Sequence, residues 1–256
     1  MTKKRIDILL VEKGLAESRT KAQAYLLSGQ VIVFGKRVDK AGTLIDEGSE
    51  VEVKERFPYV SRGALKLQKA YEEFGFDFKD KVICDIGSST GGFTDFALAR
   101  GAKKVYAIDV GYGQLDQKLR NNPAVINMER TNIRDVKSLP EPIDIFTIDV
   151  SFISLKQVLQ IVKQLIKKRM TNDKRQKTCD IVALIKPQFE VGKKIADKYK
   201  GVIKDEKIQS GVVDDISKFA KELGFGAKGI PESPILGAKG NKEFLIWLCY
   251  NCKAND

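Results

Sequence analysis

A glycine-rich segment is the first place where the residue types indicate chemistry. It follows an apolar run at 81–86 and extends from Asp85 to Phe93, through Gly87, Ser88, Ser89, Thr90, Gly91 and Gly92. Glycines let the backbone turn sharply after a strand and approach a ligand closely. Asp109 ends the next apolar run, and an acid roughly 20 residues after such a loop can bind both hydroxyls of an adenosine ribose. The pattern predicts a site for an adenosine cofactor.

The same residues disfavour several other chemistries. No Gly-Lys-Ser/Thr follows the glycines, and their spacing departs from Gly-x-Gly-x-x-Gly, so neither a phosphate-binding loop nor a dinucleotide site is indicated. The chain contains no histidine, which excludes Ser-His-Asp and Cys-His catalysis and a histidine general base. Acid–base chemistry must therefore use lysine, aspartate, glutamate, tyrosine or the backbone.

Alternating strands and helices must position these residues. The pattern predicts strands over 81–86, 105–109, 143–150, 179–186 and 243–250, with helices over 64–74, 93–100, 155–168 and about 208–223. Such alternation predicts an α/β fold, with a mostly parallel, doubly wound sheet and helices on both of its faces. Ligands of these folds bind at the carboxyl ends of the strands, where the glycine-rich segment lies.

The first fifty residues have a different organisation. Helical spacing before Gly14 and again between Ser18 and Gly29 predicts two short helices, and valine-rich runs at 31–33 and 51–53 predict small strands. Residues 5–53 resemble the S4-type RNA-binding module, a small α+β domain. The resemblance implies that the basic residues gathered here contact RNA: Lys4, Arg5, Arg19, Lys21, Lys36 and Arg37.

A break in the pattern separates this module from the rest of the chain. Pro58 disfavours a helix at the residue before it, and Gly63 stands just before a new helical run. We predict an S4-like domain over residues 1–59, a linker over 60–63 and a catalytic domain over 64–256.

Three further motifs are similar to those of one family. Residues 85–95, 149–154 and 184–190 resemble the hemolysin A (TlyA) family, which joins an S4-type module to a core similar to FtsJ-type ribose methyltransferases. The resemblance covers nearly the whole chain. It implies a class I, Rossmann-like methyltransferase fold with an antiparallel last strand, S-adenosyl-L-methionine as cofactor, and ribosomal RNA or ribosomal subunits as partner. The implied reaction is 2′-O-methylation, with cytidine as the expected target.

The FtsJ-type enzymes use a Lys-Asp-Lys-Glu tetrad, which the resemblance places on Lys66, Asp149, Lys186 and Glu243. A ribose 2′-hydroxyl is a very weak acid, so its attack on a sulfonium methyl group needs a base and a rigid in-line geometry. Lysine acts as a base only where burial or a neighbouring cation depresses its pKa. We therefore expect Lys186 to be the base and Lys66 its neighbouring cation, with the two carboxylates orienting the pair.

The cofactor is expected to contact residues of the glycine-rich segment, Asp109 and Asp149. Asp85 has two interpretations, because its side chain can bond the loop backbone as well as orient the cofactor. Asn132 follows the third strand region and is a predicted neighbour of the adenine ring.

Two other functional classes stay open at this stage. A non-catalytic RNA-binding or assembly protein would keep the same sites without turnover. A membrane-acting hemolysin, which the family name suggests, is disfavoured because no apolar run approaches the ~20 residues of a membrane span and the N-terminus does not look like a signal peptide. We expect a cytoplasmic protein. Its net charge of +11 favours an anionic partner.

Cys249 and Cys252 form a C-x-x-C without a second cysteine pair, so we expect no metal site. The basic run at 163–177 is interpreted as a solvated helix end and loop. By family resemblance, the short C-terminal tail favours a large-subunit substrate alone. Neither the methylated nucleotide nor the oligomeric state follows from the sequence.

Overall fold

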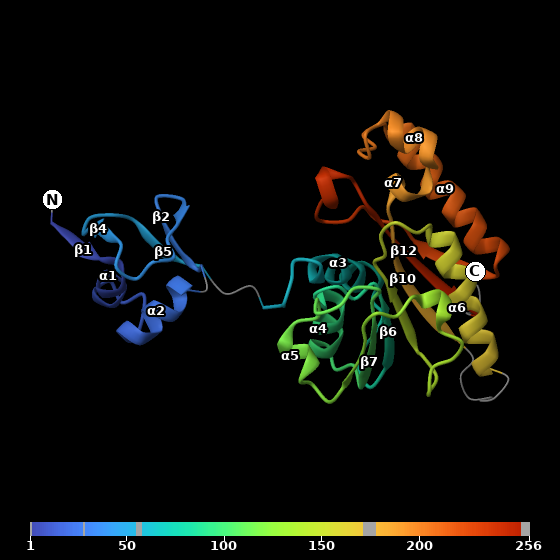
Figure 1. Ribbon diagram of the computed structural model, residues 1–256, viewed down its shortest axis with the longest axis horizontal. Coiled ribbons are helices and arrows are strands. Elements are labelled where there is room, and N and C mark those ends of the chain that lie inside the picture. The colour runs from blue at the N-terminus through green and yellow to red at the C-terminus, as the bar shows by residue number, and fades with distance from the viewer. Residues whose placement is uncertain (1, 28, 55–57, 171–177, 252–256) are drawn as a thin grey trace. The chain divides into compact units, whose positions relative to one another are not determined.

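The computed structural model in Figure 1 describes residues 2–27, 29–54, 58–170 and 178–251. It divides into two compact units, residues 1–58 and 59–256, each with its own hydrophobic core. Cys252 and residues 171–177 of the basic run lie outside the described residues. No helix in the described ranges is long and apolar enough to cross a membrane, and His, Cys, Asp and Glu side chains form no candidate metal group there.

The first unit packs two helices on short strands. Its elements are β1 (Lys3–Arg5), α1 (Ile6–Glu12), α2 (Arg19–Leu27), β2 (Val31–Val33), β3 (Lys36–Arg37), β4 (Leu44–Asp46) and β5 (Val51–Val53). β1 pairs with β4, and β2 lies between β3 and β5, all antiparallel. Both predicted helices form. α2 begins beside Ser18, whose Oγ accepts a hydrogen bond from the Lys21 backbone N–H at 3.2 Å, as expected of a capping serine.

The second unit is built on a seven-stranded sheet in the order β11-β12-β10-β9-β6-β7-β8. β12 runs antiparallel to both of its neighbours, and the pairs from β10 to β8 are parallel. The predicted α/β fold with an antiparallel last strand is therefore confirmed. The strands are β6 (Val82–Ile86), β7 (Lys104–Ile108), β8 (Val125–Met128), β9 (Ile145–Ile148), β10 (Cys179–Ile185), β11 (Phe225–Gly229) and β12 (Phe244–Tyr250).

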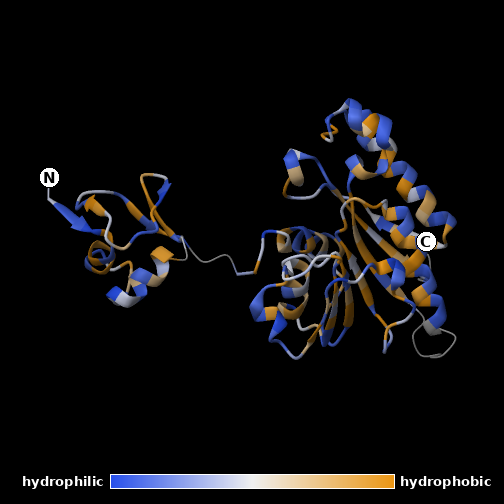
Figure 2. Cartoon of the chain, viewed as in Figure 1, coloured by the Kyte–Doolittle hydropathy of each residue, from blue (hydrophilic) through white to orange (hydrophobic). Residues whose placement is uncertain are grey.

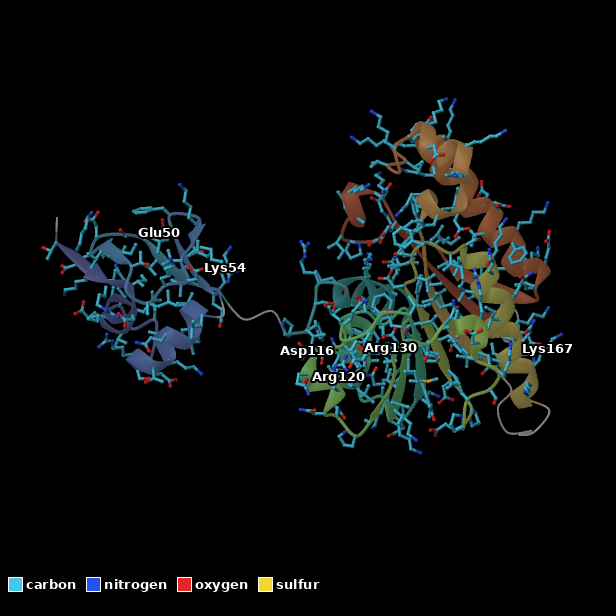
Figure 3. The ribbon with its side chains drawn as sticks, viewed as in Figure 1. Glu50, Lys54, Asp116, Arg120, Arg130 and Lys167 are labelled. Atoms are coloured by element: carbon cyan, nitrogen blue, oxygen red, sulfur yellow. The ribbon has the colours of Figure 1, made fainter. Side chains whose placement is uncertain are left out.

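Helices cover both faces of this sheet. One core cluster joins the sheet to α6 (Leu155–Met170) and α9 (Glu206–Glu222), and the other joins it to α3 (Ala64–Phe74) and α4 (Gly92–Ala99). The strands between them are almost continuously apolar (Figure 2), as buried parallel strands must be. Polar side chains lie on the outer faces of the helices, and Lys167 extends from the end of α6 (Figure 3).

The segment before α3 belongs to the second unit. The Val60 backbone N–H donates to Asp95 Oδ2 at 2.9 Å, and the ring of Tyr59 packs against Phe96 with 5.4 Å between centroids. Residues 59–63 are thus fixed against α4, and they bring Ser61 and Gly63 to the carboxyl edge of the sheet. The predicted helix over 64–74 has the bounds of α3.

Candidate active site

The carboxyl ends of β6, β7, β9 and β10 meet at one edge of the sheet. The chain leaves β6 toward β7 on one side and reaches β9 on the other side only later. This reversal is the position at which open α/β sheets bind their ligands. The loops that follow these four strands carry the glycine-rich segment, Asp109, Asp149 and Lys186.

Two glycines of the first loop lie where no side chain fits. Gly87 has a φ of +83°, and a Cβ there would lie 2.5 Å from the Asp149 carbonyl oxygen. A Cβ on Gly92 would lie 2.5 Å from Ser61 Oγ. The carboxylate of Asp109 holds the loop from its other side, because it accepts backbone N–H bonds from Ser89 at 2.8 Å and Gly111 at 2.7 Å. The loop is therefore a fixed backbone cradle.

Two adjoining cavities open beside this cradle, and Gly87, Ser89, Asp149 and Ser151 line both. The first, of about 450 Å³, is lined by apolar side chains and by Asp109 and Asn132, a size and lining typical of small-molecule sites. The second, of about 250 Å³, contains Lys66, Lys186 and Glu243. Four other predicted cofactor residues line the second cavity: Ser88, Thr90, Gly92 and Phe93.

The residues present fit an S-adenosylmethionine molecule. The apolar walls and the Asp109 carboxylate of the first cavity suit an adenosine, since each carboxylate oxygen keeps lone pairs for a ribose hydroxyl. The glycine cradle and the acidic groups of the second cavity suit the charged sulfonium end. Asn132 Oδ1 accepts the Arg134 backbone N–H at 3.1 Å, which leaves its amide N–H groups for the ring.

Asp85 lies beneath the loop, where it joins three elements. Its carboxylate accepts hydrogen bonds from Thr94 Oγ1 of α4 at 2.7 Å and from Thr147 Oγ1 of β9 at 3.0 Å. It is only 1 % exposed, and neither cavity has Asp85 or Gly91 in its lining. Burial raises the pKa of Asp85 to about 6, although both threonine hydroxyls oppose the shift. The contacts support a role in fixing the loop.

Replacing Asp85 with asparagine tests this role through pH. An acid whose pKa is higher in the folded protein destabilises that state as pH rises from the unfolded value near 3.8 to about 6. The shift corresponds to about 3 kcal/mol. We expect the stability of the wild type, measured relative to Asp85→Asn by urea unfolding, to fall between pH 4 and 7 and then to level off. A pH-independent difference would contradict the assignment.

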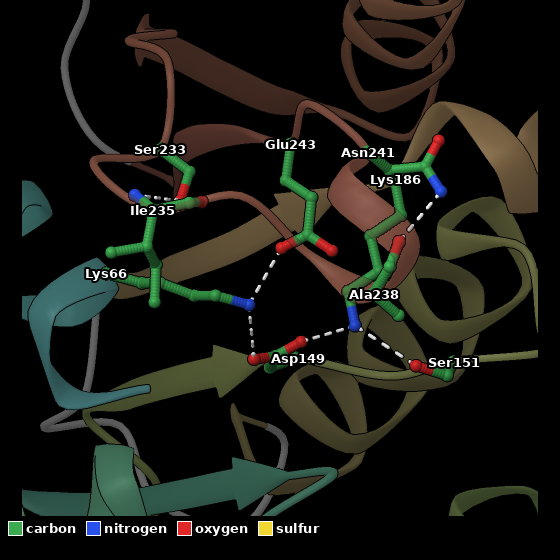
Figure 4. Close-up of polar contacts among 9 residues, drawn as sticks. All are labelled: Lys66, Asp149, Ser151, Lys186, Ser233, Ile235, Ala238, Asn241 and Glu243. Atoms are coloured by element: carbon green, nitrogen blue, oxygen red, sulfur yellow. Dashed lines mark hydrogen bonds and ion pairs between the residues drawn. The ribbon is translucent and has the colours of Figure 1, made fainter. Parts of the chain in front are cut away.

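The four tetrad residues come together (Figure 4) and all line the second cavity, while Asp149 also lines the first. Lys66 Nζ lies 2.7 Å from Glu243 Oε2 and 3.2 Å from Asp149 Oδ2. Lys186 Nζ lies 2.5 Å from Asp149 Oδ1 and donates to Ser151 Oγ at 3.1 Å. Both lysines and Glu243 are less than a tenth exposed. Residues separated by up to 177 positions thus form one ionic chain.

The two lysines differ in their partners. Burial lowers the pKa of Lys66, but the carboxylates of Asp149 and Glu243 outweigh it, and the pKa is raised overall. Burial raises the pKa of Asp149, yet the ammonium groups of Lys186 and Lys66 outweigh it and hold the pKa below its ordinary value. Lys66 is therefore the fixed cation of the chain, whereas Lys186 has one carboxylate and one hydroxyl as partners.

The loop that carries Glu243 contains site residues that sequence reasoning missed. Gly237 and Ala238 line the second cavity, and a Cβ on Gly237 would collide with the Glu243 carboxylate. Asn241 is buried and braces the loop, because its amide donates to the carbonyls of Gly201 at 2.9 Å and Ala238 at 3.0 Å. The Gly-Ala-Lys-Gly-Asn run at 237–241 was the feature of the sequence that could have indicated this loop.

A short helix, α7 (Pro187–Glu190), follows Lys186 and ties the site together. Glu190 accepts hydrogen bonds from Ser154 Oγ at 2.6 Å and the Leu155 backbone N–H at 2.7 Å. The ring of Phe189 packs on Phe152 with 5.0 Å between centroids. Phe152 is 91 % exposed and has a φ of +63°, an uncommon conformation for a bulky residue. An exposed aromatic residue whose backbone adopts an uncommon conformation at the edge of a cavity is a candidate for a functional surface.

In the first unit, three of the six residues predicted to contact RNA form ion pairs with acidic side chains. Asp7 is fully buried and binds Arg5 at 3.0 Å and Arg19 at 2.8 Å. The pKa of Asp7 lies well below its usual range because of the hydrogen bond from Arg5 and then, against burial, that from Arg19. Lys4 pairs with Glu12 and Glu47.

The other three predicted contacts are freer. Within the described part of this unit, Lys21, Lys36 and Arg37 form no ion pair, and all three are exposed. These residues are the better candidates for phosphate contacts, while Asp7 fixes the direction of Arg5 and Arg19.

The sheet order, the antiparallel β12 and the cradle at the switch point together define a class I methyltransferase. Family models agree: residues 59–250 match the FtsJ-like methyltransferase model, and residues 4–51 match the S4 domain model. The chain belongs to the hemolysin A (TlyA) family of FtsJ-like methyltransferases, as its resemblance to that family indicated.

Individual relatives share nearly the whole chain. A Bacillus subtilis protein, provisionally named an rRNA methyltransferase, is 46% identical over 96% of this chain and 85% of its own. The Mycobacterium tuberculosis 16S/23S rRNA (cytidine-2′-O)-methyltransferase TlyA is 39% identical over 95% of this chain and 89% of its own. A solved Streptococcus thermophilus structure, provisionally named a hemolysin, has 40% identity and a TM-score of 0.71, covering 98% of this chain and 89% of its own.

Proposed function

We propose that this protein transfers the methyl group of S-adenosylmethionine to the ribose 2′-oxygen of a cytidine in ribosomal RNA, with the large subunit as its principal substrate. The observation that carries the proposal is the convergence of Lys66, Asp149, Lys186 and Glu243 in one buried ionic chain beside a cavity that suits the cofactor. The name of the Mycobacterium tuberculosis relative supports the cytidine and the ribosomal substrate.

Each tetrad residue has a role in this proposal. The bound cofactor would supply an electrophilic methyl group. Lys186, with the fewer anionic partners, accepts the proton of the 2′-hydroxyl as its oxygen attacks. Lys66, whose pKa is raised by the carboxylates of Asp149 and Glu243, stays cationic and does not accept the proton. Asp149 contacts both ammonium groups and thereby fixes the distance between them. A fixed pair keeps the attacking 2′-oxygen in line with the methyl group.

The two units have different roles in this proposal. The methyltransferase unit contains every residue of the two cavities, while Lys21, Lys36 and Arg37 of the S4 unit supply phosphate contacts whose affinity depends on salt. A ribose inside a folded RNA reaches a cavity only if its nucleotide rotates out of the helix. A structured ribosomal helix or an assembled subunit is therefore the expected substrate.

Phe152 offers a surface for an unstacked base, and its replacement tests this. Stacking on an aromatic side chain contributes about 1–3 kcal/mol per base, so Phe152→Ala is expected to lower kcat/KM for RNA about tenfold or more. Because the ring is 91 % exposed, Tm should change little. Phe152→Tyr, which keeps the stacking face, should retain most of the activity. Equal losses in both variants would contradict a stacking role.

The function itself is tested with labelled S-adenosylmethionine and separately purified, unmodified ribosomal subunits. We expect label in the RNA of the large subunit, and the parallel reaction shows whether the small subunit is also methylated. If both subunits stay unlabelled with protein that binds the cofactor in calorimetry, the result would instead favour a non-catalytic RNA-binding or assembly role.

A further inference from the structure

Gln188 is a buried polar residue of the second cavity that the tetrad does not use. Its side chain is only 8 % exposed, and it lines this cavity together with Lys66, Lys186 and Glu243. Its amide oxygen Oε1 is buried and accepts no hydrogen bond from the described residues. A buried amide without a partner costs about 1–3 kcal/mol, and such groups are rare enough in native proteins to need an explanation.

The neighbours of Gln188 show that the unpaired oxygen is not caused by a loosely held helix. Lys186 is fixed by Asp149 and Ser151, Phe189 packs on Phe152, and Glu190 bonds Ser154 and the start of α6. The Phe189 backbone N–H also donates to the Lys186 carbonyl at 2.9 Å. α7 is therefore fixed by residues on both sides of Gln188 in the sequence, and Gln188 itself lines the cavity.

We propose that Gln188 is a substrate-binding residue that holds the target nucleotide by the Watson–Crick edge of its rotated base. The inference rests on the proposed function. In an RNA chain the 3′ and 5′ oxygens of the target are esterified, and its 2′-hydroxyl donates to Lys186. The donor that a cytidine has left is its N4 amino group. That amino group supplies the partner that Oε1 lacks, while uridine has an acceptor at the same position.

A near-isosteric replacement, Gln188→Leu, separates this role from a structural one. Loss of the base contact should lower kcat/KM for ribosomal RNA about tenfold to a hundredfold, with no change in cofactor affinity measured by calorimetry. Tm should not fall, because the variant removes a buried amide oxygen that has no hydrogen-bond partner among the described residues. Gln209 is a matched control, since it is 4 % exposed but donates to the Ile203 carbonyl at 2.7 Å. Gln209→Leu should therefore lower Tm.

The deciding comparison uses ribosomal subunits with cytidine or uridine at the methylated position. Wild-type protein should prefer cytidine, and Gln188→Leu should lose most of that preference. The same preference in both proteins, or a loss of cofactor affinity in the variant alone, would overturn the inference. If the wild type methylates no ribosomal RNA, the proposed function fails and this inference fails with it. An active wild type beside an equally active and equally selective variant overturns the inference alone.

Discussion

Lys186→Ala is expected to reduce methyl transfer to ribosomal RNA by about a hundredfold to ten-thousandfold, the usual contribution of a general base. The variant loses the group that accepts the 2′-hydroxyl proton, whereas Lys66, Asp149 and Glu243 keep their ion pairs. Single-turnover transfer of labelled methyl groups measures the effect. The variant should still bind the cofactor in calorimetry, because the cavity that suits the adenosine does not include Lys186.

Lys186→Arg is the control that separates basicity from charge. An arginine keeps a cation beside Asp149 but does not give up its proton in proteins. We therefore expect Lys186→Arg to be nearly as slow as Lys186→Ala. An arginine variant with most of the wild-type rate would mean that the site needs only a positive charge. An alanine variant with most of that rate would remove Lys186 from the mechanism.

Removal of residues 1–58 is expected to leave a folded protein that binds S-adenosylmethionine but methylates ribosomal subunits at least about a hundredfold less efficiently. The second unit has its own core and both cavities, so calorimetry should give a cofactor affinity close to that of the full chain. The loss should appear in KM for RNA, because the S4 unit supplies counterion-releasing phosphate contacts.

The salt dependence of the two proteins provides the matching control. The full chain should lose activity more steeply with added salt than the protein lacking residues 1–58, since it makes more phosphate contacts. A triple variant of the full chain, with Lys21, Lys36 and Arg37 changed to alanine, should lie between the two. A shortened protein with full activity on subunits would contradict the assigned role of the S4 unit.

The central strands and long helices could be predicted because their pattern is strong. Buried strands such as β6 and β10 are apolar except for one aspartate each. α3 follows Gly63 and ends before Gly75, which adopts a left-handed conformation as a C-cap. The edge strands are different. β11 contains two glycines, and β8 has two exposed residues among four, so neither has a strand pattern. α8 (Lys193–Lys198) has no buried residue at all.

The candidate site likewise contains residues that could be predicted from the sequence and residues that could not. Motif positions predicted which residues face the carboxyl edge, because a strand end fixes the location of the residue after it. Contacts made by distant loops could not be predicted. Nothing in the sequence shows that Asp7 pairs with two of the basic residues expected to bind RNA, or that Asp85 bonds two threonines beneath the glycine loop. Gln188 likewise became notable only through the partner that it lacks.

The most direct test of the central claim is the chemical identity of the methylated nucleoside. Ribosomal subunits methylated in vitro by the purified protein would be digested to nucleosides and separated by liquid chromatography with mass spectrometry. We expect 2′-O-methylcytidine, formed by the wild type and nearly absent with Lys186→Ala. A methyl group on a base atom, or undiminished 2′-O-methylcytidine with the variant, would contradict it.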